Sequence, residues 1–410
     1  MSRINDLIAQ LCPNGVEYDN LGNVGEFIRG NGLQKSDLID AGTPAIHYGQ
    51  IHTYYGTWAE STKSFTDPDL AARLRRAQPG DLVIATTSED DEAVAKATAW
   101  LGDGEVVVSG DAYIYRHNIN PKYVAYFFQS EPFQQQKTRG ITGTKVRRIS
   151  GSSLAKIKIP IPPSAIQDEI VSILDKLSYL QPELESELES ELELRSRQYE
   201  YYRNLLLAVP AEGTVRWATI SEICTKVTSG GTPSSGRTDY YGGEIPWLRT
   251  QEVDYTDITE TGMTITEAGL KNSSAKWIPP NCVIVAMYGA TAAKVAVNAI
   301  PLTTNQACCN LQVDPAQAEY RYVFHWVANE YECLKGLGEG SQSNLNAQKV
   351  KNYPIPVPSL EHQREIVSIL DNFDALVNDL SIGLPAELNA RRKQYEYYRD
   401  KLLTFDEAVS

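Results

Sequence analysis

The chain has 410 residues, of which 42% are hydrophobic, and a formal net charge of −14 at pH 7. Its length predicts two or more domains, and its hydrophobic content excludes a wholly disordered chain. No apolar run approaches the ~20 residues of a membrane span. The N-terminal residues lack a secretory signal, so we expect a cytoplasmic protein without membrane contact. Six cysteines without a C-x-x-C pair indicate reduced thiols rather than a zinc site or disulfide framework.

The sequence is internally duplicated. The segment EIVSILD occurs at residues 169–175 and 365–371, and QYEYYR occurs at 198–203 and 394–399, both at an offset of 196 residues. The rest of each half matches only loosely and at changing offsets, as loops with insertions and deletions do. Each half is therefore a variable globular part followed by a near-identical helical part. Duplication without division of labour is one reading, but unequal divergence favours two modules with similar jobs on different targets.

The duplication predicts four parts. We expect globular parts at 1–156 and 211–352, and helical spacers at 157–210 and 353–410. The predicted fold class is α+β, with two pseudo-repeated globular α/β domains separated by two long antiparallel helices that form a coiled coil. Because each globular part must begin where a helix ends, the helices most simply bury their apolar stripes against each other. The alternative is that each helix packs on its own domain.

The first globular part carries a basic stretch although the chain is acidic overall. Between Lys137 and Lys158 there are seven Lys and Arg residues and no acidic residue. The negative net charge therefore does not exclude a local nucleic-acid surface.

The first helical part has apolar residues at spacings of three and four from residue 166 to 206, which predicts one long helix. Ser164 and Ser359 follow proline-rich extended runs and are predicted N-caps. Three residues are expected to kink or interrupt the helices: Pro182, Gly383 and Pro385. Within the first helix, residues 182–193 read PELE, SELE, SELE. Four leucines are candidates for the helix–helix seam: Leu184, Leu188, Leu380 and Leu384.

The second globular part has no convincing catalytic motif. Residues 231–238 imitate a phosphate-binding loop, but Arg237 stands where lysine is required and the preceding segment is polar. The whole chain has no H-E-x-x-H, G-x-S-x-G or Cys/His metal spacing, and its five histidines are scattered. We therefore expect a non-catalytic chain that binds no cofactor or metal of its own.

Several segments in order resemble the specificity subunit of type I DNA restriction–modification systems. Residues 229–234 (SGGTPS) and 240–249 (YYGGEIPWLR) resemble the opening of that family's target-recognition domains. Residues 338–345 (GEGSQSNL) and 352–358 (NYPIPVP) resemble the end of these domains, and QYEYYR is similar to the end of the family's conserved helices.

The first half departs from this pattern. It keeps only Gly30, Asn31 and Gly32 near the expected SGGTP, and it has GTKVRRI at 143–149 where the second half has GSQSNL. Residue-level comparison with the family is therefore weaker for domain one.

The resemblance implies a division of labour. Each globular part would read one half of a bipartite, asymmetric target in double-stranded DNA, and the helices would hold the two readers apart. The helices would also dock two methyltransferase subunits, which carry S-adenosylmethionine and methylate adenine N6. Motor-nuclease subunits with ATP and Mg²⁺ would complete the restriction complex. The SELE tetrads resemble short repeats whose number sets the spacer between half-sites in some family members.

Base readout requires polar side chains presented to the major groove. In domain two the predicted contacts come from loops with family-like flanks: Arg249, Thr250, Gln251, Tyr288, Ser341, Gln342 and Asn344. In domain one the matching stretches offer His47, Tyr48, Gln50, Thr86, Thr144, Lys145 and Arg147. Three further basic residues are predicted to contact phosphate: Lys137, Arg139 and Arg148.

Two other functions remain open at this point. One is a coiled-coil scaffold that displays two carbohydrate- or peptide-binding modules, and it would not bind DNA. The other is a self-contained methyltransferase or nuclease, which the missing motifs disfavour.

Overall fold

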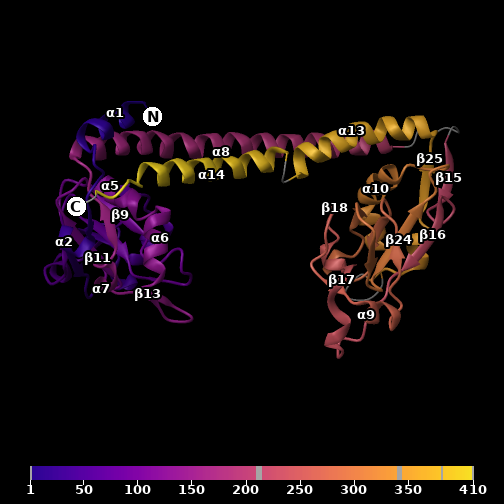
Figure 1. Cartoon of the computed structure of the whole chain (residues 1–410), viewed down its shortest axis with the longest axis horizontal. Coiled ribbons are helices and arrows are strands. Elements are labelled where there is room, and N and C mark those ends of the chain that lie inside the picture. The colour runs from indigo at the N-terminus through magenta and orange to yellow at the C-terminus, as the bar shows by residue number, and fades with distance from the viewer. Residues whose placement is uncertain (1, 209–214, 339–343, 380–381, 409–410) are drawn as a thin grey trace. The chain divides into compact units, whose positions relative to one another are not determined.

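The computed structural model describes residues 2–208, 215–338, 344–379 and 382–408. The chain forms two compact units, Met1–Glu187 with Leu388–Ser410, and Leu188–Glu387. Each unit contains a globular domain beside paired helices (Figure 1). The globular parts are called domain one (residues 1–156) and domain two (residues 211–352) below.

Domain one is built from three sheets and short helices. The largest sheet has the order β2 (Gly25–Arg29), β11 (Ala112–His117), β7 (Leu82–Ala85), β9 (Ala97–Trp100) and β4 (Trp58–Ala59). A four-stranded sheet has the order β5 (Ser64–Thr66), β3 (Thr43–Ile46), β10 (Val106–Val108) and β6 (Arg76–Ala77), and a small sheet contains β12 (Ile141–Thr142), β13 (Arg147–Ile149) and β8 (Thr87–Ser88). The helices are α1 (Ser2–Leu11), α2 (Leu21–Val24), α3 (Tyr48–Thr53), α4 (Pro68–Ala71), α5 (Pro121–Phe127), α6 (Glu131–Thr138) and α7 (Gly151–Leu154).

Domain two repeats this plan. Its five-stranded sheet has the order β16 (Cys224–Ser229), β24 (Cys308–Val313), β21 (Val283–Ala286), β22 (Val295–Asn298) and β18 (Asp257–Ile258). Its four-stranded sheet has the order β19 (Thr264–Ile265), β17 (Tyr241–Leu248), β23 (Leu302–Thr304) and β20 (Trp277–Ile278). The helices are α9 (Glu267–Lys271), α10 (Tyr320–Asn329), α11 (Tyr331–Gly336) and α12 (Ala347–Lys351).

The two domains share one topology although their sequences match only loosely. In each five-stranded sheet the first four strands pair antiparallel and the last pair is parallel. The central strands β7 and β21 are buried along their whole length, as their unbroken apolar sequences require. Both follow a proline turn with left-handed backbone, at Gly80 (φ +95°) and Asn281 (φ +64°). The structure therefore confirms the predicted pair of pseudo-repeated α/β domains.

A two-stranded ribbon joins each domain to its helices. In unit one, β1 (Tyr18–Asn20) pairs with β14 (Lys158–Pro160), and in unit two, β15 (Arg216–Thr219) pairs with β25 (Pro354–Val357). The C-terminal segment also returns to unit one, where the Val16 amide donates to the Asp406 carbonyl oxygen at 2.9 Å. No helix in the described part of the chain is long and apolar enough to cross a membrane.

The first helical part forms one continuous helix, α8 (Ser164–Leu207), which passes through Pro182. The helix is therefore not interrupted at Pro182, because proline removes only one backbone donor, and a kink at this residue stays a prediction. Ser164 is the first residue of α8 rather than its N-cap, whereas Ser359 accepts a hydrogen bond from the His362 amide as predicted.

The second helical part is interrupted where the sequence predicts. Helix α13 (Leu360–Asn378) ends before Gly383, and α14 (Leu384–Leu402) begins after it. A Cβ atom on Gly383 would lie 2.5 Å from the carbonyl oxygen of Ala375, so only glycine fits there. Pro385 lies in the first turn of α14, where its missing N–H costs nothing.

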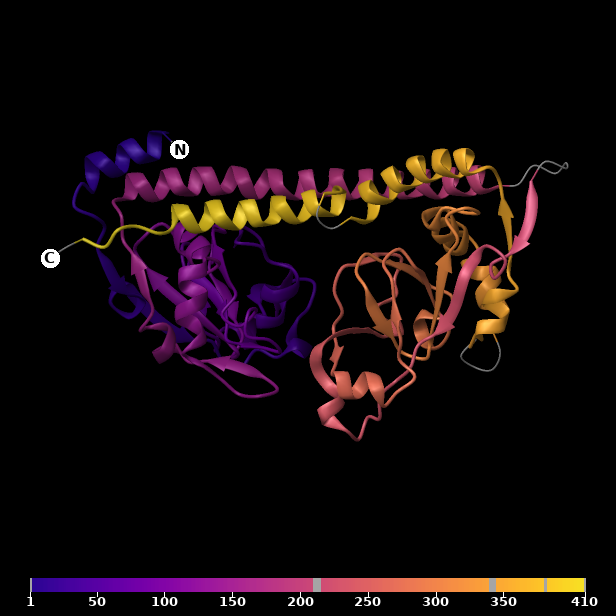
Figure 2. The same ribbon diagram turned by 45° about the vertical axis from the view of Figure 1, so that its right-hand side comes forward.

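The helices pair antiparallel within each unit (Figures 1 and 2). In unit one, Ser178 of α8 bonds the Tyr395 hydroxyl of α14 at 2.9 Å, and Glu185 accepts from Arg392 at 3.1 Å. In unit two, Tyr202 of α8 stacks on Phe373 of α13 with ring centroids 5.4 Å apart. The predicted antiparallel pairing is confirmed.

The alternative packing is also present, because the same helices enter the domain cores. Ile166, Ile170 and Leu174 of α8 belong to the core of domain one, and Ile366 and Leu370 of α13 belong to that of domain two. Each of these helices therefore contacts both a partner helix and the core of a domain.

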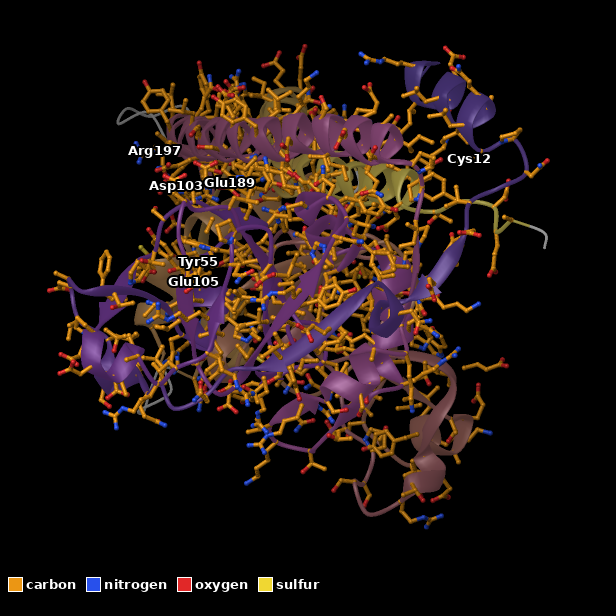
Figure 3. The ribbon with its side chains drawn as sticks, turned by 90° about the vertical axis from the view of Figure 1, so that its left-hand side faces the viewer. Cys12, Tyr55, Asp103, Glu105, Glu189 and Arg197 are labelled. Carbon is orange, nitrogen blue, oxygen red and sulfur yellow. The ribbon has the colours of Figure 1, made fainter. Side chains whose placement is uncertain are left out.

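The six cysteines are free thiols. Burial raises the pKa of Cys282 to about 11 and that of Cys309 to about 12, so these thiols stay protonated and unreactive at neutral pH. Cys12 lies just beyond α1, apart from the buried Tyr55 (Figure 3), and packs against the core cluster of domain one that contains Leu21.

Each domain is fastened to its helix by equivalent hydrogen bonds. Gln167 accepts from the Asn120 amide and donates to the Pro162 carbonyl oxygen. Gln363, 196 residues later, accepts from the Glu319 amide and donates to the Pro358 carbonyl oxygen. The duplication thus preserves the glutamine that joins each domain to its helix.

A charged contact beside each glutamine differs between the units. In unit one, Asp175 accepts from Lys122 at 2.7 Å and from the Tyr126 hydroxyl at 2.9 Å. In unit two, the equivalent Asp371 accepts from Arg321 at 2.9 Å and lies 2.7 Å from Nε2 of His325. The carboxylate position is common to both units, but its partners have different chemistry.

Buried histidines predict acid sensitivity. Burial lowers the pKa of His325, and it lowers that of His117 in domain one to about 4. Below about pH 6.5 the unfolded chain therefore binds protons that the folded chain does not, so stability falls as pH falls. His117 alone should cost roughly 2 kcal/mol between pH 6.5 and 5.

Urea unfolding of the wild type and of His117→Gln across this pH range tests this expectation. The variant should lose part of the slope of stability against pH. An unchanged slope would show that His117 does not titrate as its burial requires.

Candidate nucleic-acid interface

A predicted reading segment of domain one is a short capped helix. Strand β3 ends at Ile46, and α3 begins two residues later. His47 caps α3, since its Nδ1 accepts from the Gly49 amide at 3.2 Å and its own amide donates to Gln50 Oε1 at 3.0 Å. The Tyr48 amide donates to Ser109 Oγ. The half-buried His47, Tyr48 and Gln50 are thus held on a rigid turn at the end of a strand.

Domain two has the same construction. Strand β17 ends at Leu248, and the Arg249 amide donates to Glu252 Oε1 at 3.1 Å across the 3₁₀ turn η3 (Thr250–Glu252). The Thr291 hydroxyl donates to the Thr250 carbonyl oxygen at 2.7 Å and ties this turn to η4 (Gly289–Thr291). Arg249 therefore occupies the position that His47 occupies in domain one.

Other predicted segments converge on these turns. In domain one, His52 Nε2 lies 3.0 Å from the Thr87 carbonyl oxygen, and Arg147 pairs with Ser88. Helix α3, strand β8 and the β12–β13 hairpin therefore meet at one end of the domain. In domain two, the Leu345 amide donates to the Met287 carbonyl oxygen at 2.8 Å, which places Asn344 beside the strand end that carries Tyr288.

The remaining predicted residues differ in exposure. Six are exposed: Arg139, Thr144, Lys145, Arg148, Gln251 and Tyr288. Arg147, Arg249 and Asn344 are half-buried. Ser341 and Gln342 lie outside the described residues. The Arg147 guanidinium pairs with Asp91 at 2.9 Å, so a phosphate or base edge would have to compete with that carboxylate.

Three predicted contacts are contradicted by burial. Lys137 is 2% exposed, and its ammonium group donates to the carbonyl oxygens of Glu92 and Val94, with burial lowering its pKa to about 8. Thr86 is buried and donates to the Asp111 carbonyl oxygen. Thr250 is 9% exposed. The sequence of a basic stretch does not show which of its lysines is buried. Lys137 stabilises the fold by bonding two backbone carbonyl oxygens and is not part of the DNA-facing surface.

Four polar atoms at these strand ends are buried and have no hydrogen-bond partner among the described residues: His52 Nδ1, Thr87 Oγ1, Arg249 Nε and Asn344 Oδ1. Burying such an atom costs free energy unless water or a ligand forms the missing hydrogen bond. His52 and Thr87 were not predicted from the sequence. They adjoin predicted residues, but only the fold shows that their polar atoms meet.

The predicted seam leucines have mixed outcomes. Leu184 is 42% exposed, so the prediction that it lies in the helix–helix seam is wrong. Every fourth residue of α8 drifts around the helix, and the seam is formed instead by residues such as Ser178 and Tyr202. Leu188 and Leu384 are half-buried, and Leu380 lies outside the described residues.

No group of three or more His, Cys, Asp or Glu residues that could hold a metal ion occurs among the described residues. The converging segments offer polar and cationic side chains on rigid turns, which is the chemistry of nucleic-acid recognition.

Known proteins are similar to this chain in sequence. The chain is 36% identical over 298 residues to the EcoR124I/EcoR124II type I restriction enzyme specificity subunit of Escherichia coli, covering 69% of this chain and 70% of that protein. It is 29% identical to a putative type I restriction enzyme specificity subunit of Haemophilus influenzae, covering 75% and 76% of the two chains.

Two solved structures share the fold at 17% identity. One comes from a study of complex assembly and conformational transition of the type I R-M system, with a TM-score of 0.65 and coverage of 96% of this chain and 98% of that chain. The other is the HsdS subunit from Thermoanaerobacter tengcongensis, with a TM-score of 0.58 and 96% coverage of each chain. The family model "Type I restriction modification DNA specificity domain" matches twice, at residues 13–194 and 214–390. The chain therefore belongs to the family of type I restriction–modification specificity subunits.

Proposed function

We propose that this chain directs a type I restriction–modification complex to a bipartite DNA target, with domain one reading one half-site and domain two the other. The observation that carries the proposal is the repeated strand-end surface, with His47 and Arg249 at equivalent positions on turns of the same construction. The turns are equivalent but their side chains differ, as expected of two readers with different half-sites.

The helices are the proposed docking sites for two methyltransferase subunits. Two pairs of exposed apolar residues recur at the 196-residue offset, Leu180 with Leu376 and Tyr201 with Tyr397. Exposed apolar side chains that repeat with the duplication fit two copies of one partner. The partners would supply S-adenosylmethionine chemistry on adenine N6, and motor-nuclease subunits would supply ATP- and Mg²⁺-dependent restriction, while this chain contributes no catalytic group or cofactor.

Substitutions at the two equivalent turns should separate the two readers. Arg249→Ala should weaken discrimination in the second half-site by about 1–3 kcal/mol, because an arginine bidentate to guanine contributes about that much. It should leave the first half-site unchanged, and His47→Ala should do the reverse. Methylation of duplex libraries by the complex with its methyltransferase subunits measures both half-sites together.

Two results would count against this function. If both variants altered both half-sites equally, the domains would not be separate readers. If the complex with methyltransferase subunits bound no DNA, the chain would be a scaffold for other ligands.

A further inference from the structure

Domain two has a polar hollow on its flank. The hollow lies where β16 and β24 of the five-stranded sheet meet β20, an edge strand of the four-stranded sheet. Its walls include Lys226, Lys276, Trp277, Asn310 and Gln312. Trp277 is 47% exposed, which is unusual for the largest apolar side chain and leaves the indole available to a ligand.

The lysines of the hollow lack acidic neighbours. No carboxylate lines the hollow. Among the described residues, neither Lys226 nor Lys276 forms an ion pair within 4.0 Å. Two exposed ammonium groups beside one hollow therefore create a local excess of positive charge in an acidic chain.

The floor of the hollow contains an incompletely bonded side chain. Asn310 is 2% exposed, and its Nδ2 donates to Thr304 Oγ1 at 2.8 Å. Its Oδ1 is buried and has no hydrogen-bond partner in the part of the chain that the structure describes. The oxygen and nitrogen of an amide are assigned by their hydrogen bonds. If the amide turns over, the Thr304 hydroxyl donates to Oδ1, and the freed NH₂ group can donate to a ligand.

Domain one fills the equivalent place with an ion pair. Arg116 of domain one and Gln312 of domain two occupy equivalent positions. Each follows the residue that lies opposite the first residue of the central strand, Tyr115 opposite Leu82 and Leu311 opposite Val283. The guanidinium of Arg116 donates to Asp81 at 2.9 Å, and Asp81 precedes β7.

In domain two, Gln312 and Cys282 stand where domain one has that arginine and aspartate, so the ion pair is absent. On the neighbouring strand of the sheet, domain one has Glu26 opposite Arg116. Domain two has Lys226 opposite Gln312. The acidic groups are thus lost from this place and a lysine is gained. Domain two therefore has a basic hollow at the place where domain one has an ion pair.

One side of the hollow is level with the strand end where the reading turn of domain two begins, whereas Cys282 and Gln312 lie at the other end of β21 from Tyr288. Strand β20 pairs antiparallel with β23 so that Trp277 is opposite Thr303, and β23 pairs with β17 so that Leu248 is opposite Thr304. Lys276 therefore lies level with the end of β17, where Arg249 and the reading turn begin.

We propose that this hollow binds a phosphate group by one of its oxygen atoms, since an interior volume of 20 Å³ has room for about one atom of that size. Lys226 and Lys276 neutralise its charge, Asn310 donates a hydrogen bond from the floor, and the Trp277 indole lies against the attached sugar or base. A DNA backbone phosphate is one source, in which case the site deepens the proposed function by fixing the register of domain two on its half-site. Free phosphate or a mononucleotide is the other source.

Salt dependence of DNA binding tests the first source. The complex with methyltransferase subunits is prepared with the double variant Lys226→Ala/Lys276→Ala. Losing one phosphate contact should lower the slope of log affinity against log salt by about 1 and weaken target and non-target duplexes by the same factor. The methylated sequence should not change. Lys271→Ala, which removes an exposed lysine of the same domain outside the hollow, should leave the slope unchanged.

Trp277 fluorescence tests the second source in the full chain. Inorganic phosphate should change the emission of the wild type, and the change should disappear in Trp277→Phe and in the double lysine variant. A lower salt slope in the double variant assigns the site to the DNA backbone, whether or not inorganic phosphate also changes the emission. A phosphate response with an unchanged slope assigns the site to free phosphate or a mononucleotide. The proposal is overturned if the double variant matches the wild type in both slope and fluorescence. If the wild-type complex binds no DNA, the proposed function fails and the fluorescence result alone decides the phosphate site.

Discussion

Replacing Arg321 by alanine should destabilise domain two by about 2–3 kcal/mol, since it removes several charged hydrogen bonds from a network that is only partly screened by water. The Arg321 side chain is 14% exposed and lies within 3.5 Å of carboxylate oxygens of Asp257, Asp371 and Asp374. Without the guanidinium, these three carboxylates repel one another, and His325 remains buried beside Asp371. The contact joins the domain to α13, so recognition of the second half-site should be lost first.

The equivalent residue of domain one provides the matched control. Lys122→Ala removes a cation that has one carboxylate partner, Asp175, which is 29% exposed. The expected cost is about 1–2 kcal/mol, and any loss of recognition should affect the first half-site. Urea unfolding monitored by tryptophan fluorescence, together with methylation of duplex libraries, measures both effects. Equal costs for the two variants would show that the three-carboxylate network has no special role.

Deleting Ser186–Glu189 from α8 should shorten the spacer between half-sites by one or two base pairs and leave both half-sites unchanged. Four helical residues span roughly 6 Å, against about 3.4 Å per base pair along a strand. Four residues are also close to one helical turn, so the apolar stripe keeps its direction. Methylation of duplex libraries with graded spacers measures the preferred gap.

Deleting only Ser186 and Glu187 is the control for this experiment. Two residues rotate the rest of α8 by roughly 200° and turn its stripe away from the partner helix. This variant should lose stability and activity rather than acquire a new spacer. An altered half-site sequence after the four-residue deletion would contradict the assignment of spacing to the helix.

The sequence predicted the architecture well because the duplication preserves the residues that join domain to helix. Asp175 and Asp371, which end the exact repeat EIVSILD, each accept a hydrogen bond from a cation of their domain, so the exact repeat was a reliable sign of a repeated structure. Glycine and proline predicted the break near Gly383, where a side chain cannot fit. At Pro182 the helix is not interrupted, because the loss of one backbone donor does not end a long helix.

The candidate DNA-contacting surface was less predictable, because it depends on which side chains the fold brings together from distant parts of the sequence. The segment around Arg249 was predicted from neighbouring residues that resemble the family, and the segment around His47 was predicted from the matching stretch of the first half. The burial of Lys137 depends on two carbonyl oxygens 43 and 45 residues away, and no local pattern reports that contact. His52 was missed for the same reason, as its partner is the carbonyl group of Thr87 in another strand.

The most direct test of the central claim is single-molecule sequencing of adenine methylation in the source genome, with this gene intact and deleted. We predict that deletion abolishes methylation at one split motif, consisting of two short half-sites around a fixed gap. Restoring the gene with Arg249→Ala should then relax one half-site only. If adenine methylation is the same with and without the gene while the chain and its methyltransferase subunits are expressed, the chain does not specify a DNA target.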